Sequence, residues 1–137
     1  VASLGDERIA PLVSPHLLQD KESAIRALQR LVLIDSRLSP IGWPEWFELN
    51  GLPLPTRPRP SFDRAAMAIA AAVDGMGVAL ESTRLAAREI ERGELVVLGG
   101  RGLHKIVRPV HFMSVRSADR ARAPVAAFVR WVQVQSA

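Results

Sequence analysis

The sequence predicts an α/β fold in which helices cover a largely parallel sheet. Segments with strand and helix patterns alternate along the 137 residues. The run LVLI at 31–34 is continuously apolar, as is typical of a strand buried on both faces. Residues 60–80 have the pattern strand, helix, strand, which indicates a crossover between two parallel strands. Together these observations favour an open α/β sheet.

The segment at 60–80 is the centre of this prediction. An extended run at 57–62 leads into apolar residues spaced three and four apart, which indicates a helix. These residues are Ala66, Ile69, Ala70 and Val73. We expect Asp63 to cap the first turn and Gly75 to take the left-handed position that ends the helix. The start of this helix should lie at the carboxyl end of a strand, where open α/β sheets bind ligands.

Five further elements are expected before this segment, in the order that the patterns give. They are a strand at 8–13, a helical turn at 16–18, a helix at 24–29, the strand at 31–34 and a helix at 44–49. Pro11 favours an edge position or a bend for the first strand, since proline donates no ladder hydrogen bond. Ser23 is expected to cap the helix that follows it. Trp43 and Trp46 lie three apart, which is more consistent with packing than with a ligand cage.

The remainder of the chain continues the alternation of strands and helices. We expect a strand at 78–80, a helix from Ser82 or Thr83 to 91, a strand at 95–98, a glycine-rich loop at 99–104, a strand at 107–115 and a helix at 121–134. The last helix has apolar residues on one face. That face comprises Val125, Phe128, Val129 and Val132.

The residue types for several kinds of chemistry are missing. The chain has no cysteine, which excludes disulfides, thiolate metal sites and cysteine nucleophiles. His16, His104 and His111 are isolated and lack the spacing of a metal site. Neither a GxSxG motif nor a P-loop is present. We therefore expect no catalytic residues, no metal and no cofactor.

The charge and hydropathy of the chain restrict its partners. The formal net charge is +4, and a nucleic-acid surface is one interpretation of it. The arginines are spread over all predicted elements, which favours scattered surface charge instead. No apolar run approaches the length of a membrane span, and the first residues do not have the pattern of a signal peptide. We expect a cytoplasmic protein without membrane contact.

Polar groups follow two of the predicted strands. Asp35 and Ser36 follow the strand at 31–34, and Ser61, Phe62 and Asp63 follow the extended run and open a helix. One interpretation is a ligand cleft with hydroxyls, an aromatic wall and free backbone N–H groups. The other is capping and turn chemistry, which the residue types favour for Asp35 and Asp63.

Five segments in this order resemble a known family. They are GDERIAPLVSPHLL at 5–18, WPEWFELNGLP at 43–53, SFDRAAMAIAAAVDGMGVAL at 61–80, AAREIERGELVVL at 86–98 and APVAAFVRWV at 123–132. The chain resembles the effector-binding domain of LysR-type transcriptional regulators, particularly their glycine-cleavage-activator and AmpR-like branch. The resemblance implies a fold like that of type 2 periplasmic binding proteins, with two α/β lobes joined by crossover strands.

In that fold the chain would supply one complete α/β lobe and part of a second. Residues 17–105 correspond to the complete lobe, and residues 1–16 and 106–137 to the partial one. A small-molecule effector would bind between lobes. By position, the resemblance implies ligand contacts at Ser61, Phe62, Asp63, Ser36 and His111.

The resemblance also implies partners. DNA would be bound by an N-terminal winged helix-turn-helix that these residues do not include, and the full-length protein would form a homodimer or tetramer. Arg37, Arg57 and Arg64 favour an anionic or zwitterionic effector. A fragment of a periplasmic-type solute-binding protein of the same fold is the alternative, and an enzyme is the least favoured.

Overall fold

The computed structural model describes residues 1–100 and 103–136 and divides into two compact units. The large unit is Arg8–Ile106, and the small unit combines Val1–Glu7 with the chain from Val107 onward. The chain passes from one unit to the other twice, in two strands. Part of the predicted glycine-rich loop, residues 101–102, lies outside the described residues.

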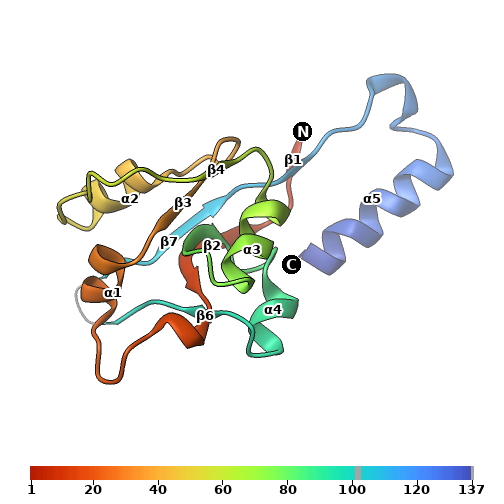
Figure 1. Cartoon of the computed structure of the whole chain (residues 1–137). Helices are drawn as coiled ribbons and strands as arrows, with labels where there is room; N and C mark the ends of the chain where they lie inside the picture. Colours follow the sequence, from red (N-terminus) through yellow and green to blue (C-terminus); the bar gives the residue numbers. More distant parts are fainter. Residues whose placement is uncertain (101–102, 137) are drawn as a thin grey trace. The chain divides into compact units, whose positions relative to one another are not determined.

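The large unit contains most of the helices and strands. They are the main part of β2 (Asp6–Val13), η1 (Pro15–Leu17), α1 (Ala24–Arg30), β3 (Leu33–Ser36), α2 (Trp43–Leu49), β4 (Ser61–Phe62), α3 (Ala65–Val73), β5 (Val78–Ser82), α4 (Ala87–Glu91) and β6 (Val96–Val97). Figure 1 shows α1 and α2 on one face of its sheet and α3 and α4 on the other. The predicted alternation of strands and helices is therefore confirmed.

The sheet of the large unit is mixed, not largely parallel as the sequence predicts. Its strand order is β4-β3-β5-β2-β6, and β7 (Ile106–Pro109) also pairs with β2. β3 is parallel to β4 and to β5, whereas β2 is antiparallel to β5 and to β6. The segment at 60–80 thus forms the predicted crossover, and β2 accounts for the antiparallel pairs.

The expectation of an edge strand at Pro11 is wrong, because β2 lies between β5 and β6. Pro11 is opposite Leu80 in the register with β5. Its carbonyl accepts a hydrogen bond from the Leu98 N–H at 2.9 Å, so its nitrogen faces the end of β6. β6 ends at Val97. The N–H that Pro11 lacks would therefore point to where the pairing of β2 with β6 has already ended.

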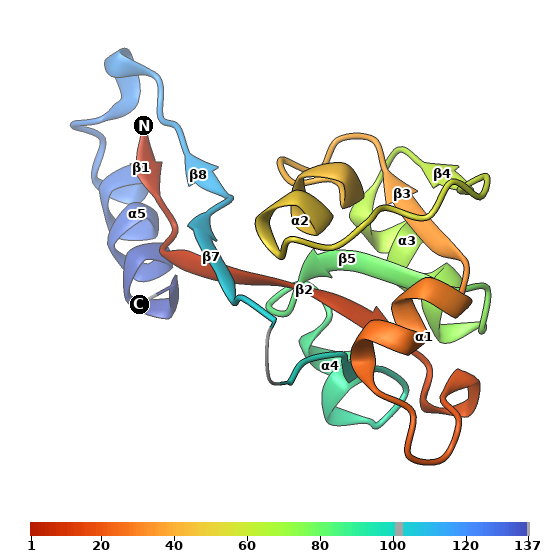
Figure 2. The same ribbon diagram turned by 90° about the vertical axis from the view of Figure 1, so that its left-hand side faces the viewer.

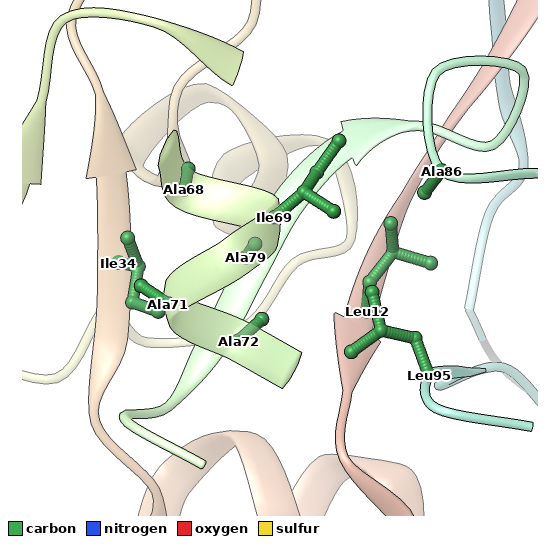
Figure 3. Close-up of a cluster of buried hydrophobic side chains, with 9 residues drawn as sticks. All are labelled: Leu12, Ile34, Ala68, Ile69, Ala71, Ala72, Ala79, Ala86 and Leu95. Atoms are coloured by element: carbon green, nitrogen blue, oxygen red, sulfur yellow. The ribbon is translucent and has the colours of Figure 1, made fainter. Parts of the chain in front are cut away.

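The core of the large unit is built around α3. Figure 3 shows side chains of α3 directed toward Ile34 of β3 and Ala79 of β5, with Leu12 of β2 and Leu95 nearby. Phe62, Val73 and other half-buried residues pack against this cluster. The helix ends in the expected way, with Gly75 at φ +83° and the Met76 N–H bonded to the Ala71 carbonyl.

Aromatic side chains of α2 fill the other face of the sheet. Trp43, Trp46 and Phe47 are each 1% exposed, which confirms packing as the role of the two tryptophans. The centroids of their rings lie 5.2–5.7 Å from one another. The Trp43 indole Nε1–H donates to the Ile34 carbonyl at 2.8 Å, so α2 is tied to β3 by a buried hydrogen bond.

Several elements of the large unit begin or end differently from the predictions, β3 and α4 most clearly. The Leu31 N–H donates to the Ala27 carbonyl, so Leu31 still belongs to the end of α1. β3 therefore starts only at Leu33. Ser23 does cap α1, accepting from the Arg26 N–H at 3.2 Å. α4 is shorter than expected and has no side-chain cap, since residues 83–86 form turns in which Ser82 Oγ accepts from the Arg84 N–H.

The small unit contains a two-stranded sheet and the last helix. β1 (Ala2–Ser3) pairs antiparallel with β8 (Phe112–Met113), and α5 (Ala123–Ser136) follows η2 (Ser117–Asp119). Figure 2 shows β1 beside β8, with α5 along this pair. The predicted strand at 107–115 is two strands, β7 and β8. No described residue of α5 is buried, so the apolar face predicted for the last helix stays at least partly exposed.

Among the glycines compared, Gly77 leaves the least room for a side chain. A β-carbon there would lie 2.3 Å from the Val32 carbonyl oxygen. We expect Gly77→Ala to lower the free energy of unfolding by about 2 kcal/mol or more, because backbone must move. Gly42→Ala is the control, since its β-carbon would meet only Pro44 Cδ at 3.6 Å. Urea denaturation measures both; equal effects would contradict the close approach.

Candidate functional site

The carboxyl ends of β3 and β4 lie side by side. In their parallel register Asp35 is opposite Ser61, and Ser36 is opposite Phe62. The Asp35 N–H donates to the Pro60 carbonyl and the Arg37 N–H to the Phe62 carbonyl, both at 2.8 Å. The structure therefore brings together Ser36, Ser61 and Phe62, with Asp63 next along the chain.

Two ion pairs join these strand ends. Arg59 Nε lies 2.9 Å from Asp35 Oδ2, and both side chains are about one quarter exposed. Arg37 Nη1 lies 3.3 Å from Asp63 Oδ1, where both side chains are about two thirds exposed. The site thus presents carboxylate and guanidinium groups close together.

The prediction that Asp63 caps α3 is wrong. The cap position is Arg64, which makes no side-chain hydrogen bond to the helix, and α3 begins at Ala65. Asp63 precedes the cap by one residue and pairs with Arg37 instead. Its carboxylate is consequently available to solvent beside the β3 end.

The remaining groups differ in exposure. Ser61 is exposed, Ser36 is half-buried and Phe62 packs partly against the core cluster. The two hydroxyls can each donate and accept hydrogen bonds, and the Phe62 ring is fixed by the core beneath it. This arrangement can bind a small polar molecule through hydroxyl and charged groups.

His111 belongs to the small unit, not to the unit that carries the strand ends. Its Nδ1 lies 2.6 Å from Glu7 Oε2, and the Glu7 side chain is fully buried. The His111 side chain is 43% exposed. With Nδ1 occupied by Glu7, its Nε2 is the nitrogen left for a further contact.

The basic residues named from the sequence are not all at this site. Arg57 donates to the Arg30 and Leu31 carbonyls at the end of α1, so it stabilises that end. Arg37 does lie at the strand ends. Arg59, which was not among the predicted basic residues, pairs with Asp35. The alternation of Arg57 and Arg59 along an extended run is the signal that points to it.

The described residues contain neither a cluster suited to a metal ion nor a membrane-spanning helix. In residues 1–100 and 103–136, no three His, Asp or Glu side chains gather where they could hold a metal ion. Over the same residues, no helix has the length and hydropathy to cross a membrane.

Comparison with known proteins places this geometry in context. A family model described as the LysR substrate binding domain matches residues 1–136. The chain is 40% identical over 136 residues to the uncharacterized HTH-type transcriptional regulator y4mQ of Sinorhizobium fredii, covering 96% of the chain and 44% of that protein. It is 45% identical over 93 residues to the HTH-type transcriptional regulator PerR of Escherichia coli K12, covering 68% and 31%. The chain thus spans less than half the length of these curated relatives.

Among solved structures, the effector domain of the transcriptional regulator AmpR of Pseudomonas aeruginosa is similar in fold. The TM-score is 0.70 at 23% identity, and the match covers 98% of this chain and 64% of that one. The predicted periplasmic-binding-protein-like α/β fold is therefore confirmed.

Capping can be separated from surface pairing by two substitutions. We expect Ser23→Ala to lower the free energy of unfolding by about 1 kcal/mol, because it removes the cap of α1. Asp63→Ala should change it by about 0.5 kcal/mol or less, because it removes an exposed ion pair. Thermal denaturation of both variants measures the difference. If Asp63→Ala lowered the free energy of unfolding as much as Ser23→Ala does, Asp63 would act as a cap of α3 after all.

Proposed function

The chain belongs to the LysR substrate-binding domain family, and on that premise we propose that the ends of β3 and β4 contact a small-molecule effector. The protein is the effector-binding domain of a LysR-type transcriptional regulator. Its relatives are named as transcriptional regulators, which favours this function over the solute-binding alternative. The family match over residues 1–136 is the observation that carries the conclusion.

The proposed effector contacts are Ser36, Ser61, Phe62 and Asp63 of the large unit, with His111 of the small unit as a further contact. The hydroxyls and the Phe62 ring sit on strand ends that the core fixes. A site on such supports holds its geometry without reordering when a ligand binds. We take the large unit as the complete lobe and the small unit as part of the other.

The charges at these strand ends favour a zwitterionic effector over a simple anion. Arg37 and Asp63 present opposite charges 3.3 Å apart, and Arg59 with Asp35 does the same at 2.9 Å. A ligand with one ammonium and one carboxylate can exchange partners with such pairs, so that no charge loses its counterion. A simple anion would leave the carboxylates of Asp35 and Asp63 opposed to it.

In the whole regulator, the effector would act by binding one conformation more tightly than another. We propose that the DNA contact belongs to a helix-turn-helix domain elsewhere in the protein, that the protein works in the cytoplasm and that this domain catalyses no reaction. These proposals follow from the relatives' names as HTH-type regulators.

Thermal-shift measurements with the twenty α-amino acids, and with the matching carboxylic acids that lack the α-amino group, test the effector class. We expect at least one amino acid to raise the melting temperature when its matching carboxylic acid does not. Ser61→Ala and Asp63→Asn should each weaken that ligand's binding about tenfold, the effect of losing one hydrogen bond to a charged group. Ser114→Ala, an exposed serine of the small unit, is the matched control. Stabilisation that persists unchanged in Ser61→Ala and Asp63→Asn would contradict the assigned site.

We also propose that the chain self-associates through α5. Phe128 and Trp131 are each 59% exposed, with ring centroids 6.2 Å apart, and Val134 is 71% exposed. A groove of about 450 Å³, lined by residues of β1, β8 and α5, lies beside them in the small unit. Apolar surface of this extent favours burial against another molecule.

Sedimentation velocity over a wide concentration range measures this association. We expect the wild-type chain to associate and Trp131→Glu to remain monomeric, because a charge on the apolar face opposes burial. Leu38→Glu is the control, since Leu38 is 79% exposed but lies in the large unit. A wild-type monomer at the highest concentration, or a Trp131→Glu variant that associates equally, would overturn the proposal.

A further inference from the structure

The small unit completely buries the side chain of an acidic residue, Glu7. Glu7 is the second residue of β2, between exposed Asp6 and half-buried Arg8. A carboxylate taken out of water is costly unless polar partners compensate for the lost hydration. The presence of Glu7 at this position therefore has to be explained by what its oxygens contact.

One partner of Glu7 is the ring of His111, which directly precedes β8. Glu7 Oε2 lies 2.6 Å from His111 Nδ1, a short distance of the kind found in hydrogen bonds to ionised groups. An ionised carboxylate only accepts hydrogen bonds, so the proton between these two atoms belongs to Nδ1. The contact therefore places a proton on one particular nitrogen of the ring.

The backbone of His111 is held by the same N-terminal segment that holds its ring. The Leu4 N–H donates to the His111 carbonyl at 2.9 Å, and Ser3 is opposite Phe112 in the β1–β8 register. The His111 side chain is nevertheless 43% exposed, and its Nε2 has no hydrogen-bond partner among the described residues. His111 is thus fixed in place with one ring nitrogen left for a ligand.

Stability alone is a weak explanation for the pair of Glu7 and His111. Apolar residues of similar volume commonly replace a buried ion pair without loss of stability. An apolar residue cannot, however, determine which ring nitrogen of a neutral histidine carries the proton. That determines whether the remaining nitrogen, Nε2, donates or accepts a hydrogen bond.

We propose that Glu7 is a positioning residue that keeps the proton of neutral His111 on Nδ1, so that Nε2 accepts a hydrogen bond from the ammonium group of the effector. This inference rests on the proposed function, in which His111 is an effector contact. The opposite tautomer presents an Nε2–H donor, which suits the carboxylate of a zwitterion instead. Glu7 thereby sets which end of a zwitterionic effector His111 contacts.

Heteronuclear magnetic resonance of the histidine ring nitrogens in the ligand-free chain tests the tautomer. Spectra are recorded at rising pH until the His111 ring is neutral, with the exposed side chains of His16 and His104 as internal references. We expect a protonated Nδ1 and an unprotonated Nε2 at His111. In Glu7→Gln, whose amide can both donate and accept, we expect a mixture of tautomers. A wild-type His111 with its proton on Nε2 would overturn the inference, whether or not any variant folds.

Binding measurements test the preference for an ammonium group, with the twenty α-amino acids and their matching carboxylic acids as probes. We expect Glu7→Gln to weaken the binding of an amino acid about tenfold, the effect of losing one hydrogen bond to a charged group. The same substitution should have no effect in a His111→Phe background, because Glu7 acts through His111. Glu91→Gln, which changes an exposed carboxylate of α4, is the matched control. Circular dichroism establishes that each variant is folded.

The outcomes separate this inference from the proposed function. Amino-acid binding that Ser61→Ala weakens and Glu7→Gln leaves unchanged would overturn the inference alone. Binding of none of the twenty amino acids would overturn the proposed effector class and, with it, the ammonium contact at His111.

Discussion

The close packing of α3 on the parallel strands β3 and β5 is the constraint on which the large unit depends. α3 has the sequence AAMAIAAAV, so its buried face presents mainly methyl groups to the sheet. Gly77, just before β5, leaves no room for a β-carbon against the Val32 carbonyl. Small residues on both sides let the crossover close tightly, and interiors packed at this density accept little added volume. The register of Leu33 with Val78 follows from that fit.

The fit determines where the polar groups lie. Because β3 is fixed between β5 and β4, its last residues, Asp35 and Ser36, emerge beside Ser61 and Phe62. β4 is only two residues long, and it is held by backbone bonds to β3, the Arg59–Asp35 pair and the packing of Phe62 on the core. A short strand with these supports presents hydroxyl and charged groups on a rigid edge. That is the kind of surface from which an effector can shift a conformational equilibrium.

Local signals in the sequence predicted the elements well where the physics is local. The presence of a helix at α3, the left-handed Gly75 that ends it and the Ser23 cap of α1 depend on neighbours a few residues away. The predicted apolar face of α3 is wrong at Ala66 and Ala70, which are exposed, because alanines on every side of the helix leave its buried face to be set by the sheet. The position of Pro11 depended on strand order, and the Asp63–Arg37 and Arg59–Asp35 pairs join residues about 25 positions apart. His111 and Glu7 are 104 residues apart. No spacing rule identifies such partners, so the places of these residues at strand ends were predictable and their pairings were not.

A crystal structure of the chain with a stabilising amino acid would show directly whether the β3 and β4 ends form an effector contact surface. Polar groups there sit on strands that the core holds in place. We expect ligand density within hydrogen-bond distance of Ser61 and Ser36, with the Phe62 ring in contact. Ligand density that touches neither serine, with the β3 and β4 ends unchanged, would contradict it.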